Sequence, residues 1–97
     1  MEVTFRLYDI EPEALDEWAR EWREHVVPLR RAAGFEILGG WPIRETSQFA
    51  WVLAYAGEEG FDAADQRYYT SPERVALDPD PARHVRAARA WKVEPAL

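Results

Sequence analysis

The stretch Gln48-Phe-Ala-Trp-Val-Leu-Ala-Tyr-Ala56 predicts a β-strand that is apolar on both faces. Successive side chains of a strand point to opposite faces, so this stretch carries two apolar sets back to back. One set consists of Phe49, Trp51, Leu53 and Tyr55, and the other of Ala50, Val52 and Ala54. Such a pattern is typical of a central strand that is covered on both sides.

Three further strands are predicted around this one. Residues 2–10 alternate their side chains with a period of two, and residues 86–94 form the last strand of the chain. Residues 35–43 contain a Gly-Gly pair, which indicates a bulge, and Pro42, which cannot donate a ladder hydrogen bond. We therefore expect residues 35–43 to form an edge strand.

Two helices are predicted between the strands. The first begins at Pro12, a favoured first-turn residue, and ends before Gly34, a natural C-cap. Its apolar stripe consists of Leu15, Trp18, Trp22, His25 and Leu29, with Ala19, Val26 and Ala33 alongside. Pro28 lies inside this helix without an N–H to donate, which predicts a kink just after His25. The second helix covers residues 61–69, and two short capped turns follow it.

The resulting order, βαββαβ over residues 1–97, predicts a single domain with the α+β, ferredoxin-like sandwich fold. In that fold the spatial strand order is 4-1-3-2, which agrees with a second strand at an edge. The helices suffice to cover one face of the sheet, so the other apolar face requires a partner, and a homodimer is the simplest solution. We place Arg6 and Tyr8, which share a face of the first strand, at the dimer interface, with anion binding as the alternative.

Composition argues against several classes of function. The net charge is −6 and the basic residues form no stripe, so we expect no nucleic-acid partner. No apolar run approaches the ~20 residues that span a bilayer, and no signal peptide is apparent, so we expect no membrane contact and a cytoplasmic location. Cysteine is absent and the two histidines share no ligand motif, so no metal site and no cofactor are predicted.

His25 is the first candidate for chemistry, because an imidazole within an apolar stripe is available to act on a ligand. It would serve as a general base, a hydrogen-bond donor or an axial haem ligand. The alternative is a partly buried histidine bonded to a backbone carbonyl. His84, near the acidic residues 78–80, is expected to be solvated at the surface.

Aromatic residues are the second candidate site. A pocket for a small apolar or aromatic ligand is predicted from side chains that come from both helices and the third strand. These side chains are Trp22, Trp51, Tyr55 and Tyr68. An ordinary aromatic core without a ligand is the alternative.

Several segments together resemble the NIPSNAP family, which belongs to the dimeric α/β-barrel superfamily of ferredoxin-like dimers. They are Arg6-x-Tyr8, Gly34-Phe35-x-x-Leu38-Gly39-x-Trp41, Phe49-x-Trp51-x-Leu53-x-Tyr55, Tyr69-x-Ser71-Pro72-Glu73-Arg74 and Asp78-Pro79-Asp80-Pro81. The resemblance covers nearly the whole chain. One departure is Glu11-Pro12 after the first strand, where the family often has Pro-Gly.

The resemblance implies a dimer whose two sheets pack face to face, with a pocket between the sheet and the helices of each subunit. The NIPSNAP family has no settled biochemical activity, so the implied function is a small-molecule-binding or structural dimer. Related superfamily members are cofactor-independent monooxygenases, haem-degrading enzymes and small isomerases. The alternative is therefore a monooxygenase- or isomerase-like enzyme, with His25 acting on a small aromatic or polyketide-like substrate.

Overall fold

The computed structural model describes residues 1–97 and contains the predicted alternation of strands and helices. Its four strands are β1 (Glu2–Ile10), β2 (Glu36–Ile43), β3 (Gln48–Tyr55) and β4 (Val85–Val93). Between β1 and β2 run α1 (Leu15–Glu21), the π-helical turn η1 (Trp22–Val26) and α2 (Val27–Ala32). Between β3 and β4 lie α3 (Phe61–Thr70), α4 (Pro72–Val75) and the 3-10 turn η2 (Pro81–His84).

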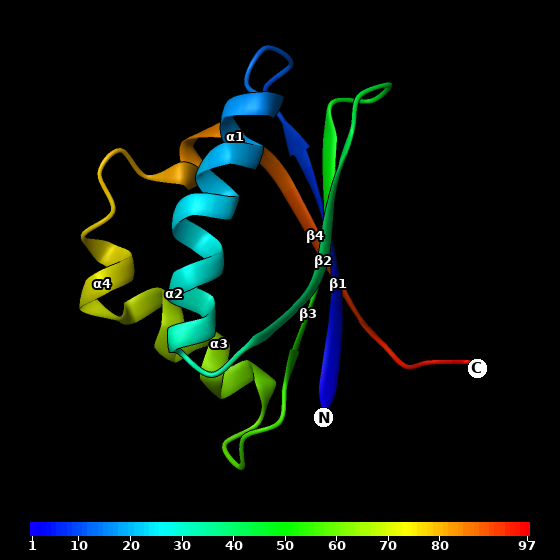
Figure 1. Cartoon of the computed structure of the whole chain (residues 1–97), viewed down its shortest axis with the longest axis vertical. Helices are drawn as coiled ribbons and strands as arrows, with labels where there is room; N and C mark the ends of the chain where they lie inside the picture. The colour runs from blue at the N-terminus through cyan, green and yellow to red at the C-terminus, as the bar shows by residue number, and fades with distance from the viewer.

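The strands form one antiparallel sheet in the order β2-β3-β1-β4. This confirms the ferredoxin-like topology and the edge position of β2. A register shift between Ile37 and Gly39 interrupts the β2–β3 ladder, as the Gly-Gly pair predicts. All helices lie on one side of the sheet, and the other side is open (Figure 1).

The core lies between the sheet and the helices, and its centre is β3. Phe49, Trp51 and Leu53 point toward the helices and are almost fully buried. Trp18 and Val26 from the first helical segment and Phe61, Ala64 and Tyr68 from α3 pack against them. No helix of the structure combines the length and the apolar character that crossing a membrane requires.

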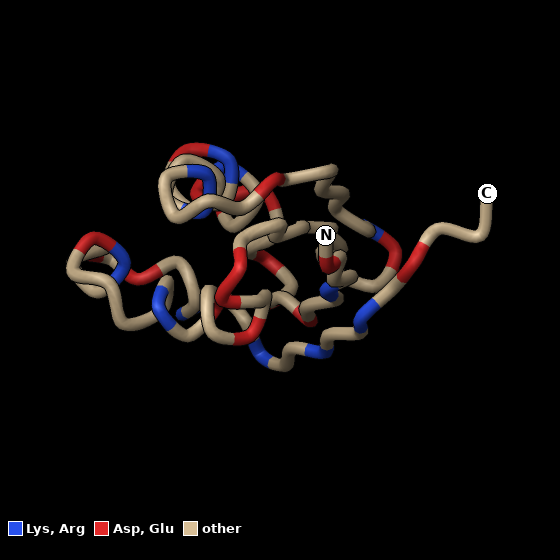
Figure 2. Tube along the Cα trace, turned by 90° about the horizontal axis from the view of Figure 1, so that it is seen from below, with Lys and Arg blue, Asp and Glu red and all other residues tan.

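The open face of the sheet is apolar at its centre. Phe5 pairs with Val52 on one side and with Trp91 on the other, and the rings of Phe5 and Trp91 lie 6.0 Å apart. Trp41 and Trp91 are about half exposed, at 52% and 47%. The basic residues of β4 pair with acidic neighbours along the sheet, and acidic and basic residues are interspersed along the trace (Figure 2).

The first helical segment differs from the predicted stripe in its second half. In the turn η1 the Val27 N–H donates to the Trp22 carbonyl, five residues back, which adds one residue to the turn. Pro28, which has no N–H to offer, follows directly. The extra residue rotates the rest of the helix, so Arg30 is buried and His25 is exposed, while Val26 and Leu29 pack against the core.

Candidate functional site

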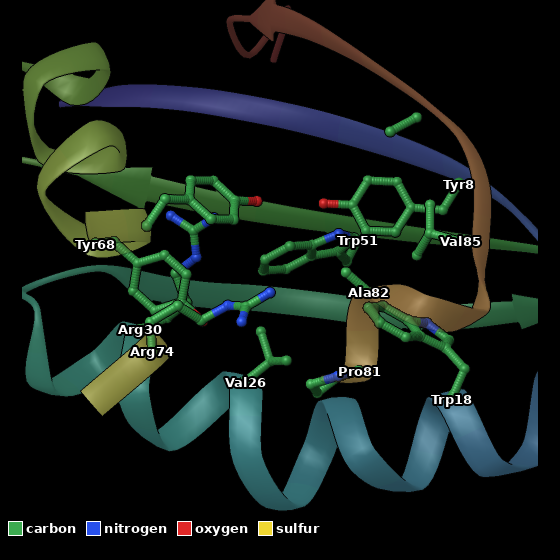
Figure 3. A pocket seen from close by; sticks show the side chains of 12 residues that line it. Tyr8, Trp18, Val26, Arg30, Trp51, Tyr68, Arg74, Pro81, Ala82 and Val85 are labelled. Atoms are coloured by element: carbon green, nitrogen blue, oxygen red, sulfur yellow. The ribbon is translucent and has the colours of Figure 1, made fainter. Parts of the chain in front are cut away.

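A cavity of about 160 Å³ lies between the sheet and the helices, on the side of β1 and β4. Side chains from every layer converge on it (Figure 3). Tyr8 and Trp51 form its floor on the sheet, and Trp18, Val26 and Arg30 border it from the first helical segment. The rest of the wall is Tyr68, Tyr69, Arg74, Pro81, Ala82, Val85 and Ala88.

The turn η2 closes one end of the cavity. Its N-cap is Asp80, whose carboxylate accepts a hydrogen bond from the Ala82 N–H at 2.9 Å. Arg74 of α4 donates to the same carboxylate oxygen at 3.0 Å, which ties α4 to η2. Pro81, next to the cap, is fully buried against the cavity. The Asp-Pro signal in the sequence thus positions part of the cavity wall.

Arg30 is a fully buried cation in this wall. Its Nη1 donates to Asp65 Oδ1 at 2.6 Å, and its guanidinium lies 3.9 Å from the centre of the Tyr68 ring. The Phe35 ring adds a second contact at 4.8 Å. Cation–π contacts of this kind stabilise a desolvated guanidinium. The sequence pattern did not reveal Arg30, because the π turn that brings it inward leaves no mark in the apolar spacing.

Arg6 lies on the same side of the sheet, beneath the helices. Its Nη2 donates to Asp65 Oδ1 at 2.9 Å, and its Nη1 donates to the Tyr8 and Tyr69 hydroxyls at 3.2 and 3.1 Å. Burial lowers the pKa of Arg6, but these neighbours outweigh burial and raise the pKa above its ordinary value. Arg6 therefore stays charged.

The expected place of Arg6 and Tyr8 at a dimer interface is wrong. Both side chains are more than nine-tenths buried within one chain, on the helix-covered face of β1. The physical reason is Asp65 of α3, which draws Arg6 to the helical side. Val3, Phe5 and Leu7 consequently face the open side.

Burial also shifts the pKa of two tyrosine hydroxyls of the cavity. Desolvation raises the pKa of Tyr8, although the nearby Arg6 works in the opposite direction. Desolvation likewise raises the pKa of Tyr68. Both hydroxyls therefore keep their protons at neutral pH and are available as hydrogen-bond donors.

Of the four predicted pocket residues, Trp51 and Tyr68 line the cavity. Trp22 lies beside it, with its ring 5.8 Å from that of Trp51, but it does not form part of the wall. Tyr55 lies elsewhere, because its hydroxyl donates to Glu59 at 2.6 Å and accepts from Arg67 in a surface cluster. The structure thus brings together two of the four.

His25 does not lie beside the cavity. The π turn directs it to the exposed side of the helix, so the predicted position within the apolar stripe is wrong. Neither the general-base role nor the packing role that the stripe suggested fits an exposed imidazole. The wall contains no histidine at all.

His84 is also placed differently from the expectation of a solvated surface residue. Its Nε2 lies 3.3 Å from Glu21 Oε2, and its side chain is mostly buried. Glu21 is itself buried, and Arg83 donates to both of its oxygens at 2.8 Å. Glu17, Glu21 and His84 have the spacing of metal ligands, but the bidentate contact of Arg83 occupies the central carboxylate and makes the cluster an ion-pair network.

Comparison with solved structures shows which known proteins share this fold. A NIPSNAP domain protein from Burkholderia xenovorans superimposes with a TM-score of 0.83 at 17% sequence identity, over 99% of this chain and 95% of that one. A NIPSNAP family protein from Agrobacterium tumefaciens gives 0.84 at 15% identity, over 98% and 92%. The chain has the fold of NIPSNAP proteins.

A second group of solved structures shares the fold at lower similarity. An antibiotic biosynthesis monooxygenase superimposes over the full length of both chains with a TM-score of 0.68 and 18% identity. No protein-family model matches this chain, and no curated protein matches it in sequence. At these identities the likeness concerns the fold, which hosts many unrelated functions.

Proposed function

We propose that this chain is a NIPSNAP-type domain that binds a small aromatic or apolar molecule and works as a homodimer. The observation that carries the proposal is the cavity of about 160 Å³, walled largely by aromatic and aliphatic side chains. A concave apolar site with a few convergent polar groups is the usual form of a ligand pocket. Its volume suits a ligand of about one aromatic ring.

The open sheet face supports the homodimer. Its centre, around Phe5, Val52 and Trp91, carries no charge, and the charges at its border, Asp9 and Arg89, pair with each other at 3.4 Å. A large apolar patch on a small domain marks an interface, and a second copy supplies the same apolar surface in return.

The experiment that tests ligand binding compares a panel of one-ring compounds, beginning with benzyl alcohol and benzoate, by isothermal titration calorimetry. A matched pair of variants locates the site. Ala88 lies at the exposed edge of the cavity, across from Tyr8, so Ala88→Trp should block entry and abolish binding. Ala63→Trp adds the same bulk on the exposed side of α3 and should bind like the unaltered protein. Failure of the whole panel to bind would contradict the proposal.

A second candidate function is a cofactor-independent monooxygenase or isomerase acting on a small aromatic or polyketide-like substrate. Its support is the fold shared with an antibiotic biosynthesis monooxygenase together with an aromatic cavity. Because His25 is exposed, proton transfer would fall to the tyrosine hydroxyls of the wall. Oxygen uptake with 1,4-dihydroxynaphthalene, faster for the unaltered protein than for Ala88→Trp, would favour this function. Equal rates for both proteins would leave the binding function alone.

A further inference from the structure

The cavity wall is rich in hydrogen-bond donors, and its only side-chain acceptors are the hydroxyl oxygens of its three tyrosines. None of its 12 residues is Asp, Glu, Asn or Gln, whereas it includes Arg30, Arg74 and two tryptophans. A ligand that fills such a space must bring the acceptors, because buried donors without partners cost free energy.

Four polar groups of the wall residues already lack partners, namely Arg30 Nε, the Tyr68 hydroxyl and two indole nitrogens. The indole Nε1 atoms of Trp18 and Trp51 are buried and form no hydrogen bond in the protein. Both side chains belong to the wall and are at least 97% buried, with exposed fractions of 3% and 1%. Figure 3 shows Trp51 lying across the middle of the cavity and Trp18 bordering it from α1. The unpaired N–H groups therefore belong to side chains that a ligand in the cavity would contact.

Two tyrosine hydroxyls of the wall also have a hydrogen without an acceptor in the protein. Tyr8 and Tyr69 each accept a hydrogen bond from Arg6 Nη1, and neither donates one to the protein. Since Arg6 uses their oxygen lone pairs, their hydrogens remain for an acceptor in the cavity. Two further donors thus converge near one point of the wall.

The charge balance around the cavity is positive. Arg6 and Arg30 are buried and share a single carboxylate oxygen, Asp65 Oδ1, while Arg74 pairs with the more exposed Asp80. The wall itself therefore contains two guanidinium groups and no carboxylate, and the two buried arginines share one carboxylate oxygen. In a medium of low dielectric constant such an excess favours the entry of an anion.

We infer that the ligand is a small monoanion, with an oxyanion such as a carboxylate or a deprotonated phenol or enol on a flat apolar body. The oxyanion would accept from the wall donors, and the flat body would pack between the rings of Trp51 and Tyr68. The inference rests on the proposed binding function and narrows its ligand class. The two arginines of the wall disfavour a cation, and the apolar side chains around them disfavour a ligand with several charges.

Three probes of the same shape test the inference on the full chain. Benzoate, benzamide and benzylamine differ in charge, and their affinities are measured by isothermal titration calorimetry at pH 7. We expect benzoate to bind about tenfold or more tightly than benzamide, because charge-assisted hydrogen bonds are roughly twice as strong as neutral ones. Benzylamine should show no binding.

A matched pair of variants assigns the preference to the wall. Arg74→Gln removes one cavity guanidinium and should reduce the benzoate preference over benzamide several-fold. Arg44→Gln removes an arginine that also pairs with an aspartate but lies at the exposed surface, and it should leave the preference unchanged. Arg74→Gln also removes the contact with Asp80 that ties α4 to η2, so circular dichroism and thermal unfolding check that both variants keep the fold.

The outcomes separate this inference from the function on which it rests. If benzamide or benzylamine binds as tightly as benzoate, the ligand class is wrong although the cavity still binds ligands. A benzoate preference that survives in Arg74→Gln would also contradict the inference. If no probe binds, the proposed binding function fails together with the inference.

Discussion

At the scale of single residues, Glu21 shows how a buried carboxylate holds the helical layer to the turn before β4. Burial alone would raise the pKa of Glu21, but hydrogen bonds from Arg83 and His84 outweigh burial and lower it. A carboxyl whose pKa is lowered by folding stabilises the protein above its unfolded pKa, and this contribution is lost as the pH falls. Glu21 is therefore part of what keeps η2, and with it one end of the cavity, in place.

The corresponding prediction is that Glu21→Gln lowers the free energy of unfolding by about 1–3 kcal/mol at pH 7. The difference from the unaltered protein should shrink as the pH falls below about 4.3, the ordinary pKa of a glutamate, because the unfolded chain then takes up a proton at Glu21 and the advantage of the folded carboxylate is progressively lost. Urea unfolding at several pH values measures both effects. Glu24→Gln is the control, since its pair with Arg20 is about half exposed and should be worth less than ~1 kcal/mol. A difference for Glu21→Gln that persists unchanged at pH 3 would contradict this account.

At the scale of elements, the turn η1 decides which residues reach the cavity. A regular helix with the spacing 3, 4, 3, 4 would turn His25 inward, and the inserted residue turns Arg30 inward instead, while Leu29 stays packed against the core. The insertion also keeps Pro28 free of the clash that a proline causes inside a regular helix. Deletion of Glu24 together with Pro28→Ala should therefore yield a regular helix that keeps the same buried residues.

We expect this double change to retain cooperative unfolding and full helical content by circular dichroism. Deletion of Glu24 alone should be less stable by about 3 kcal/mol, the cost of a proline in a helix interior. Deletion of Glu17 is the control, because α1 is regular there and the loss would rotate Leu15 away from the core. If both deletions lowered the free energy of unfolding equally, the π turn would not be the reason that Arg30 rather than His25 faces the core.

The elements also show what a single sequence can predict. The strands followed from local patterns, since β3 is apolar on both faces and β2 carries a Gly-Gly pair and Pro42. The site was predicted less completely, because the burial of its arginines depends on contacts between residues that are far apart in the sequence. Asp65 lies 59 residues from Arg6 and 35 from Arg30 along the chain, and no spacing rule joins them. Pro28 was the one local signal of an irregular helix, and it did not specify the extra residue.

At the scale of the whole molecule, the two faces of the sheet have different surroundings, because the helices cover only one of them. One face and the helices enclose the cavity, and the other face is proposed to meet a second copy. We predict that Trp91→Glu yields a monomer at concentrations where the unaltered chain is a dimer, because it places a charge at the centre of the apolar face. Light scattering coupled to size-exclusion chromatography measures the mass.

Val75→Glu provides the matched control for that prediction. Val75 is even more exposed than Trp91, at 70%, but it lies on α4 in the helical layer. The variant should keep the mass of the unaltered protein. An equal loss of mass in both variants would point to the helical layer as the interface, and no loss in either would contradict a dimer through the open face.

Native mass spectrometry of the purified protein tests the central claim most directly, because it reports the assembly and its contents together. The account predicts twice the 11.3 kDa of one chain, with an additional small mass per chain that is removed by Ala88→Trp or displaced by benzoate. A monomer would contradict the proposed use of the open face. A dimer that carries no added mass and takes up neither benzoate nor benzamide would contradict the proposed function of the cavity.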